Sequence, residues 1–296
     1  MTVSIRPADP NRPGFAGVCT GVDIAKGVSR EDAMAIEKGM DHYAVLVLPG
    51  QNINDDQQYA FSQHFGPMET ATGDIAQASQ RRLSMDINDI SNLDKDGKVL
   101  ARDDRRRLFG LGNQLWHSDS SFKATPSKYS LLSARVIPGK GGNTEYADMR
   151  AAWDALDEET KAICRPLVCE HSQLYSRAII GFTEFTEEEK IKYAPVPQRL
   201  VRRHMGSGRT SLFLASHAGA IQGWPIPEAR AFLRDLTEHA TQRQFVYSHQ
   251  WTQHDLVMWD NRCTMHRARP FNYSEVRDMH RTTVADCAPT LQQQAA

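Results

Sequence analysis

The sequence predicts a β-rich α+β fold: a jelly-roll or barrel core of short strands, flanked by helices, in one domain over residues 1–296. Short apolar runs bounded by glycine and proline dominate both halves of the chain. Helical patterns are confined to the N-terminal part and the middle, and they do not alternate with strands as βαβ units would. Hydrophobic residues make up 40% of the chain, which is enough for a sizeable core.

The first half of the chain contains clear local signals. Ser29 begins a helix whose apolar residues recur at helical spacing, and Asn54 caps a second helix. Residues 44–48 form an apolar run that a proline-glycine pair stops, which predicts a buried strand. Residues 94–97 (DKDG) predict a hairpin tip, and residues 105–107 (RRR) predict a solvated loop without a glycine-rich phosphate nest.

The second half mixes strand and helix signals. Asp148, Asp157 and Thr186 each precede a run with a helical pattern. Pro227 opens a longer helix. Residues 177–203 are polar with one short helix, which predicts an insertion of the kind that forms a lid over a site. Strands are predicted at residues 129–137, 245–247, 256–259 and 282–285.

Charge and composition exclude several classes of protein. The 35 Lys and Arg balance 36 Asp and Glu for a formal net charge of −1, which argues against a nucleic-acid binder or a polybasic membrane protein. No apolar run approaches the length of a membrane span, and residues 1–12 have no apolar region typical of a secretory signal. The five cysteines include no C-x-x-C pair, so we expect reduced thiols and a cytoplasmic protein.

The residues that point to chemistry lie around His117. His117 and Asp119 are two apart, so on a strand both side chains would face one cavity and could bind one metal ion. His266, which follows the predicted strand at residues 256–259, is the best candidate for a third ligand. Two histidines and one carboxylate form a facial triad, which leaves positions open for substrate and O₂.

Taken together, these residues resemble the family of Fe(II)- and 2-oxoglutarate-dependent dioxygenases that includes taurine dioxygenase and 2,4-dichlorophenoxyacetate dioxygenase. The resemblance covers nearly the whole chain. It implies a double-stranded β-helix (jelly roll) with Fe(II), 2-oxoglutarate and O₂, with ascorbate helping the reaction in vitro. The matching stretches are residues 15–24 (FAGVCTGVDI), 45–51 (VLVLPGQ), 61–67 (FSQHFGP), 116–122 (WHSDSSF), 141–144 (GGNT), 259–268 (WDNRCTMHRA) and 279–282 (MHRT).

The resemblance also implies roles for individual residues. His117, Asp119 and His266 match the iron ligands. Thr144 matches the residue whose hydroxyl meets 2-oxoglutarate, and Arg277 matches the arginine that holds its far carboxylate. Arg281 matches the arginine that grips the acidic group of the prime substrate. A guanidinium group can bind a carboxylate with two hydrogen bonds, and the even spacing of Arg277 and Arg281 would point both into one barrel.

The similarity is greatest to the 2,4-dichlorophenoxyacetate branch. We therefore expect hydroxylation of a small acidic aromatic substrate, an aryloxyalkanoate, to give a phenol, glyoxylate, succinate and CO₂. Asn113 is a candidate for substrate contact, Ser120 could offer its backbone N–H, and His204 and His217 resemble histidines that approach the substrate. The branch-specific stretches are residues 89–92 (DISN), 113–122 (NQLWHSDSSF), 146–152 (YADMRAA) and 240–247 (ATQRQFVY).

Two other functions stay open. The same chemistry on a sulfonate or alkyl sulfate is disfavoured, because no histidine between His64 and His117 matches the sulfonate-binding histidine of taurine-type members. A non-enzymatic metal-binding barrel would need neither Thr144 nor the paired arginines. We expect a homo-oligomer that binds neither nucleic acid nor membrane.

Overall fold

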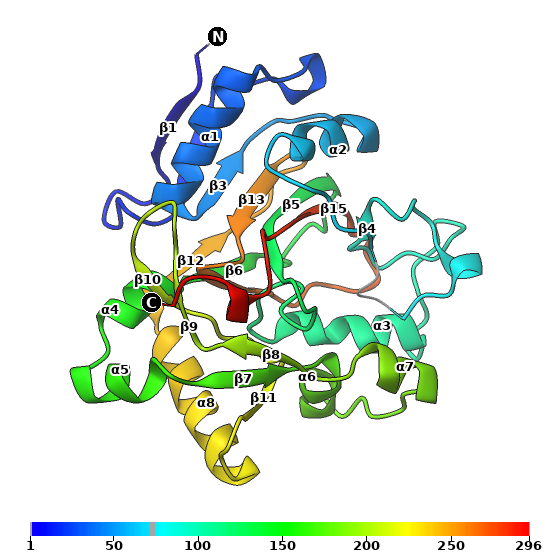
Figure 1. Ribbon diagram of the computed structural model, residues 1–296. Helices are drawn as coiled ribbons and strands as arrows, with labels where there is room; N and C mark the ends of the chain where they lie inside the picture. Colours follow the sequence, from blue (N-terminus) through cyan, green and yellow to red (C-terminus); the bar gives the residue numbers. More distant parts are fainter. Residues whose placement is uncertain (1, 72–74, 296) are drawn as a thin grey trace.

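The structure is a computed structural model that describes residues 2–71 and 75–295. Its largest sheet has the strand order β1-β2-β3-β13-β5-β15-β4, so strands from both ends of the chain lie side by side (Figure 1). Neighbouring strands are antiparallel, except that β2 runs parallel to β3. The strands are β1 (Ser4–Pro7), β2 (Gly17–Thr20), β3 (Val45–Leu48), β4 (Asn88–Asp89), β5 (Ser127–Val136), β13 (Leu256–Asp260) and β15 (Asp278–Ala285).

A smaller sheet packs against this large one. It has the order β12-β6-β14, with β6 (Thr144–Asp148) between β12 (Val246–His249) and β14 (Thr264–Ala268). Leu132 and Trp259 from the large sheet and Tyr146 from the small sheet belong to one buried apolar cluster, so the two sheets share a core. The predicted β-rich α+β class is confirmed.

Two helices cover the outer face of the large sheet (Figure 1). The predicted N-terminal helix is α1 (Arg30–Tyr43), which Ser29 caps by accepting a hydrogen bond from the Asp32 amide. The second is α2 (Asp55–Gln63), which begins with a full capping box between Asn54 and Gln57. Both predictions are confirmed, and the apolar faces of these helices pack on β3, β5 and β13 in one cluster.

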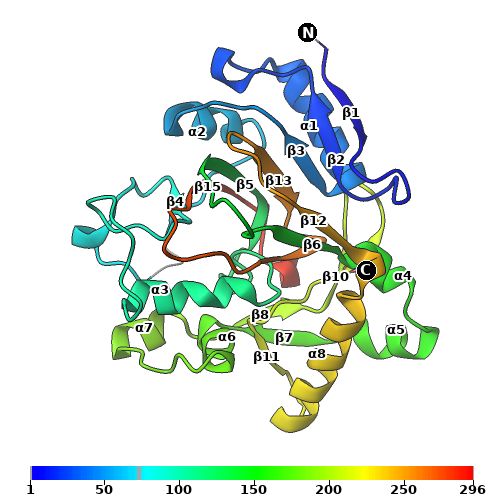
Figure 2. The same cartoon turned by 180° about the vertical axis from the view of Figure 1, so that it is seen from behind.

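The remaining strands lie at the opposite end of the molecule, next to the longest helix (Figure 2). That helix, α8 (Ile226–Ala240), has proline at its second position and buries Leu233 and Leu236. It belongs to an apolar cluster with the strands around it. These strands are β7 (Val168–His171), β8 (Val196–Arg199), β9 (Val201–Arg203), β10 (Thr210–Leu212) and β11 (Ala218–Ile221).

The expected insertion at residues 177–203 is only partly separate from the sheets. Its first part contains α7 (Glu187–Lys192), which starts with the predicted capping box at Thr186. Its last part forms β8 and β9, and β8 pairs with β7 along its full length. Strands β8 and β9 therefore belong to two small sheets and not to a polar excursion, because β7 and β10 respectively satisfy their backbone hydrogen bonds.

Four shorter α-helices, five 3-10 helices and one hairpin turn remain among the described residues. Residues 105–107, predicted as a solvated loop, instead open helix α3, so that prediction is wrong. Asp104 caps this helix with its side chain, a signal that the arginine run masked. The hairpin tip at residues 94–97 is confirmed by the bridge between Leu93 and Val99. The other helical elements are α3 (Arg105–Gly110), α4 (Met149–Asp154), α5 (Glu158–Cys164), α6 (Gln173–Ile179), η1 (Ile24–Lys26), η2 (Ala78–Gln80), η3 (Leu111–Gln114), η4 (Arg243–Phe245) and η5 (Thr290–Gln292).

Within the described part of the chain, no helix has both the length and the apolar character needed to span a membrane. All five cysteines are free, as the sequence predicted, and only Cys287 is exposed.

Candidate active site

Two histidines from distant parts of the chain face each other between the sheets. His117 precedes β5, and His266 lies on β14. Each backbone N–H donates to the carbonyl of the other residue, at 3.0 and 2.8 Å, so the two side chains are held on one face. Their ring centroids are 4.2 Å apart. The structure therefore brings together the two predicted ligand histidines.

Asp119 completes this set, although not in the way the sequence predicted. His117 makes only an isolated bridge and Asp119 lies in a turn, so the two residues do not share a regular strand. Ser120, in the same turn, has a left-handed backbone with φ of 53°. One ligand atom from each of His117, Asp119 and His266 lies within 4.8 Å of the others. The turn, not strand alternation, aims the carboxylate at the histidines.

A network of hydrogen bonds fixes the carboxylate of Asp119. Ser130 Oγ donates to Oδ2 at 2.7 Å, and Arg281 Nη1 donates to Oδ1 at 2.6 Å. The backbone N–H of Asp119 donates to Asn261 Oδ1 at 3.0 Å, and this oxygen also accepts from Trp259 Nε1. Burial alone would raise the pKa of Asp119, but the Arg281 charge, the neighbouring histidines and the Ser130 hydrogen bond together outweigh burial and hold that pKa below its ordinary value. The carboxylate is thus ionised and rigid.

The protonation of the histidines fits a metal site. His117 Nδ1 lies 2.7 Å from the carbonyl oxygen of Leu115, which can only accept, so Nε2 keeps its lone pair. Burial lowers the pKa of both His117 and His266, so both rings are neutral at physiological pH. Two neutral imidazoles and one carboxylate are the donor set that suits Fe(II) with open coordination positions. These three residues could therefore hold a divalent metal ion.

One pocket is lined by His117 and Asp119, with His266 outside its lining, and cationic side chains outnumber acidic ones among its described lining residues. Such a concentration of one sign of charge in a cleft attracts small anions. The lining cations are Arg81, Arg82, Arg106, Arg107, Lys123, Arg177, Arg269, Arg277 and Arg281.

Arg277 lines the pocket just before β15 and is buried. Its backbone N–H donates to Asn92 Oδ1 at 2.9 Å, and its side-chain Nη1 donates to the carbonyl of Ile90 at 3.2 Å. Burial lowers the pKa of Arg277 to about 10, so the group stays charged at neutral pH. Among the described residues it has no carboxylate partner, which makes it suitable for an anionic ligand.

Thr144 lies on β6 next to the pocket but is not part of its lining in the structure. Its hydroxyl accepts a hydrogen bond from Trp251 Nε1 at 3.0 Å. Its strand partner on β14, Ala268, does line the pocket. Thr144 therefore lies on the strand beside the pocket-lining Ala268, and its own side chain does not line the pocket where 2-oxoglutarate was expected to meet it.

The other expected substrate contacts lie in the pocket, with one exception. Arg281, Asn113, Ser120 and His217 all line it. The side-chain hydroxyl of Ser120 donates to Glu69 Oε2 at 2.8 Å, so this hydrogen bond does not involve the backbone N–H of Ser120. His217 is buried with its ring 5.9 Å from that of His117. Burial lowers the pKa of His217 well below its ordinary value, so this ring is neutral as well.

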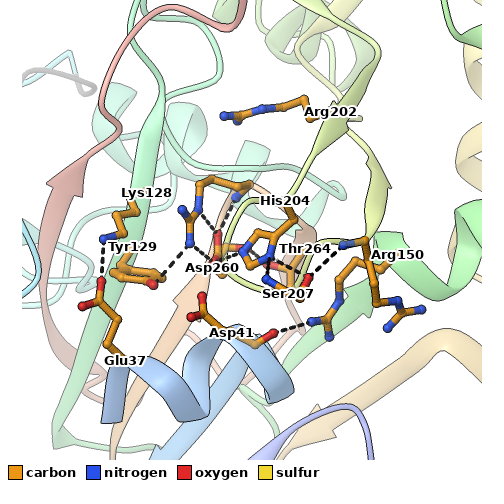
Figure 3. Close-up of polar contacts among 12 residues, drawn as sticks. Glu37, Asp41, Lys128, Tyr129, Arg150, Arg202, His204, Ser207, Asp260 and Thr264 are labelled. Carbon is orange, nitrogen blue, oxygen red and sulfur yellow. Dashed lines mark hydrogen bonds and ion pairs between the residues drawn. The ribbon is translucent and has the colours of Figure 1, made fainter. Parts of the chain in front are cut away.

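The exception is His204, whose predicted substrate contact is wrong. His204 is fully buried away from the pocket, between Ser207 and Asp260 (Figure 3). The Ser207 N–H donates to Nδ1 at 3.1 Å, so Nε2 carries the proton and donates to Asp260 Oδ2 at 2.9 Å. Asp260 is a buried charge that also pairs with Arg262. His204 is therefore committed to satisfying a buried carboxylate.

Sequence reasoning missed several residues of the site. Arg177 on α6 is buried and faces the pocket, although its place in the expected insertion gave no sign of this. Ser130 and Asn261 fix Asp119; Asn261 lies within the matching stretch 259–268, whereas Ser130 lies outside every matching stretch and gave no signal. Arg106 and Arg107 belong to the run predicted as a solvated loop, yet both line the pocket.

Comparison with known proteins identifies the family. Residues 4–283 match the family described as "Taurine catabolism dioxygenase TauD, TfdA family". The chain is 44% identical over 281 residues to an alpha-ketoglutarate-dependent 2,4-dichlorophenoxyacetate dioxygenase of Cupriavidus pinatubonensis, covering 95% of this chain and 98% of the relative. It is 35% identical to a (S)-phenoxypropionate/alpha-ketoglutarate-dioxygenase of Delftia acidovorans, covering 93% and 94% of the two chains.

Solved structures agree. The crystal structure of AAD-2 in complex with Mn(II) and N-oxalylglycine superposes with a TM-score of 0.94 at 55% identity, covering 98% of this chain and 100% of that one. The chain belongs to the TauD, TfdA family. It is accordingly a non-haem iron dioxygenase that depends on 2-oxoglutarate, and the jelly-roll expectation is confirmed.

Proposed function

We propose that the protein hydroxylates an aryloxyalkanoate such as 2,4-dichlorophenoxyacetate at the carbon between the ether oxygen and the carboxylate. With an aryloxyacetate, the hemiacetal product collapses to a phenol and glyoxylate, while 2-oxoglutarate is converted to succinate and CO₂; a 2-aryloxypropionate would give a phenol and pyruvate. The observation that carries this proposal is the excess of cationic side chains around the ligand set, because both organic reactants are anions. The relatives named for phenoxyacetate and phenoxypropionate support the choice of substrate class.

His117, Asp119 and His266 would hold Fe(II). Bound with 2-oxoglutarate and O₂, the iron supplies the oxidising power for hydroxylation, and the protein supplies orientation and exclusion of water. The contacts of Ser130 and Asn261 with Asp119 keep the carboxylate in one orientation, so the donor set is formed before a metal binds.

The arginines divide the anions between them. Arg277 would bind the far carboxylate of 2-oxoglutarate, with Thr144 contributing its hydroxyl after a local adjustment. Arg281 would bind the carboxylate of the aryloxyalkanoate: only its Nη1 is bonded to Asp119, and its buried Nε has no partner among the described residues. Asn113, the Ser120 backbone and His217 would complete the substrate contacts.

A panel of substrates tests this proposal. The purified protein is incubated with Fe(II), ascorbate and 2-oxoglutarate, and succinate is measured with phenoxyacetate, both phenoxypropionate enantiomers, taurine and an alkyl sulfate. We expect succinate and phenol with at least one aryloxyalkanoate, and little succinate with taurine or the alkyl sulfate. Turnover of only the sulfur compounds would assign a taurine-type substrate, and no turnover with any acid would favour a non-enzymatic metal-binding barrel.

Two further properties are part of the proposal. The five free cysteines fit the reducing cytoplasm as the place of action. The protein is expected to form a homo-oligomer, which light scattering of the purified chain would measure directly.

A further inference from the structure

The chain buries four arginines almost completely, and they fall into two kinds. Arg150 and Arg202 lie outside the pocket, and each pairs with an aspartate, Asp148 and Asp286 respectively. Arg177 and Arg277 line the pocket, and neither has a carboxylate partner among the described residues. Buried guanidinium groups are ordinarily paired, because an unpaired buried charge is strongly destabilising.

Arg177 is held in place without being neutralised. Its Nη1 donates to Ser176 Oγ at 3.0 Å, and its guanidinium lies 4.2 Å from the ring centroid of Phe109. Its buried Nε–H has no partner among the described residues. Burial lowers the pKa of Arg177 to about 10, so the side chain remains a cation at neutral pH.

The backbone opposite Arg177 makes room for it. A Cβ on Gly112 would lie 2.5 Å from the guanidinium, which is too close for any real contact. Gly112 has no left-handed backbone conformation that would itself require glycine. The lack of a side chain at Gly112 therefore allows the guanidinium group of Arg177 to lie against the pocket wall.

Arg177 is linked to one of the predicted ligand histidines through its neighbours. Ser176 Oγ contacts both Arg177 and His217 Nδ1, and the His217 ring lies 5.9 Å from that of His117. Arg277 lines the same pocket from the segment before β15, where its Nη1 donates to the carbonyl of Ile90. The pocket thus has two buried cations without a carboxylate partner among the described residues, and the proposed reaction uses two organic anions.

We propose that Arg177 is a specificity-determining residue that binds the carboxylate of the prime substrate, as a second point of attachment besides Arg281. This inference rests on the proposed aryloxyalkanoate activity. Arg281 already has an anion, Asp119, as its partner, whereas Arg177 has none within the part of the chain that the structure describes. Arg177 therefore supplies the uncompensated positive charge that makes the pocket prefer a carboxylate to a neutral group of the same shape.

Binding measurements with a charged and a neutral ligand test the proposal. The protein is loaded with Mn(II) and N-oxalylglycine, and calorimetry gives the affinities of phenoxyacetate and of the neutral phenoxyacetamide. A charge-assisted hydrogen bond is worth roughly 10- to 100-fold in affinity. We expect Arg177→Gln to weaken phenoxyacetate binding by that factor and to change phenoxyacetamide binding less than about twofold. Arg234→Gln, at an exposed position on α8, is the charge control.

Gly112→Ala is a second variant that keeps the charge but displaces it. Its new methyl group pushes the guanidinium from its place, whereas Gly14→Ala, the control outside the pocket, adds a methyl group that meets nothing within 4 Å. We expect Gly112→Ala to weaken phenoxyacetate binding more than phenoxyacetamide binding, and Gly14→Ala to weaken neither. If Arg177→Gln does not fold, this pair decides.

The proposal is overturned if either test variant keeps the wild-type preference for the carboxylate, or loses affinity for both ligands equally. In those cases Arg177 has a structural role only. Failure of the proposed function looks different, because the wild-type enzyme itself would then form no phenol from any aryloxyalkanoate.

Discussion

Arg281 Nη1 donates a hydrogen bond of 2.6 Å to Oδ1 of Asp119, which joins the arginine expected to hold the substrate to the acidic member of the metal-ligand set. The bond keeps the buried carboxylate ionised and uses only one of the N–H groups of the guanidinium. The same side chain therefore contacts a predicted metal ligand, which Ser130 and Asn261 also hold, and lines the pocket that the substrate would enter.

Arg281→Ala is expected to raise the KM for phenoxyacetate roughly 10- to 100-fold, since a charged hydrogen bond to the carboxylate is lost. The KM for 2-oxoglutarate should change much less. Steady-state kinetics with each reactant varied in turn would measure both. Equal changes in the two KM values would contradict the division of anions between Arg281 and Arg277.

Arg277→Ala is expected to show the reverse pattern, with the larger rise in the KM for 2-oxoglutarate. Arg277 is buried and carries no carboxylate partner among the described residues, so its removal takes away charge that only a ligand neutralises. Arg277→Lys should recover part of the affinity for 2-oxoglutarate, but a lysine cannot bind the carboxylate with two parallel hydrogen bonds as an arginine can. A 2-oxoglutarate KM unchanged in Arg277→Ala would show that the co-substrate binds elsewhere.

His204→Asn tests the correction made by the structure. His204 donates to the buried Asp260 and does not line the pocket, so the variant should lose about 1–3 kcal/mol of unfolding free energy. Its KM for phenoxyacetate should stay close to the wild-type value. Urea unfolding and steady-state kinetics give the two numbers, with His64→Asn at an exposed position as the control. A stable variant with a raised KM would restore the substrate role of His204.

His280 is expected to make stability depend on pH. Burial lowers its pKa, but hydrogen bonds to Asp278 and Asp55 outweigh burial, so the net pKa is raised above the ordinary 6.5. A raised pKa means that the stabilisation is complete below pH 6.5 and is lost as the pH rises through the folded-state value. His280→Gln should therefore reduce the unfolding free energy most in acid and least at alkaline pH. A loss that is independent of pH would refute the ion-pair explanation.

Local signals in the sequence were sufficient for much of the fold. Ser29, Asn54 and Thr186 each cap a helix as predicted, because a cap depends on residues three positions away. The sequence also predicted that His117, Asp119 and His266 lie together, from motifs far apart in the chain that resemble one family, and their ligand atoms do lie within 4.8 Å of one another. Strands at residues 196–203 were missed, because short polar strands are stabilised by partners that are distant in sequence.

The direction of individual side chains was not predictable in the same way. His204 and His217 both lie in segments that resemble the family, yet one bonds to Asp260 and the other faces the pocket. Arg177 gave no signal, because its unpaired burial is a property of the packed structure. Tertiary contacts determine whether a buried charged group has an oppositely charged partner, and no local sequence pattern encodes these contacts.

The most direct test of the central claim is the ratio of products formed by the wild-type protein and by His117→Ala. With Fe(II), 2-oxoglutarate and phenoxyacetate, we predict that the wild type forms phenol and succinate in equal amounts. His117→Ala should form neither, because the loss of one of three ligands disrupts the metal site. Succinate without phenol in the wild type, or phenol formation that survives in His117→Ala, would contradict the account.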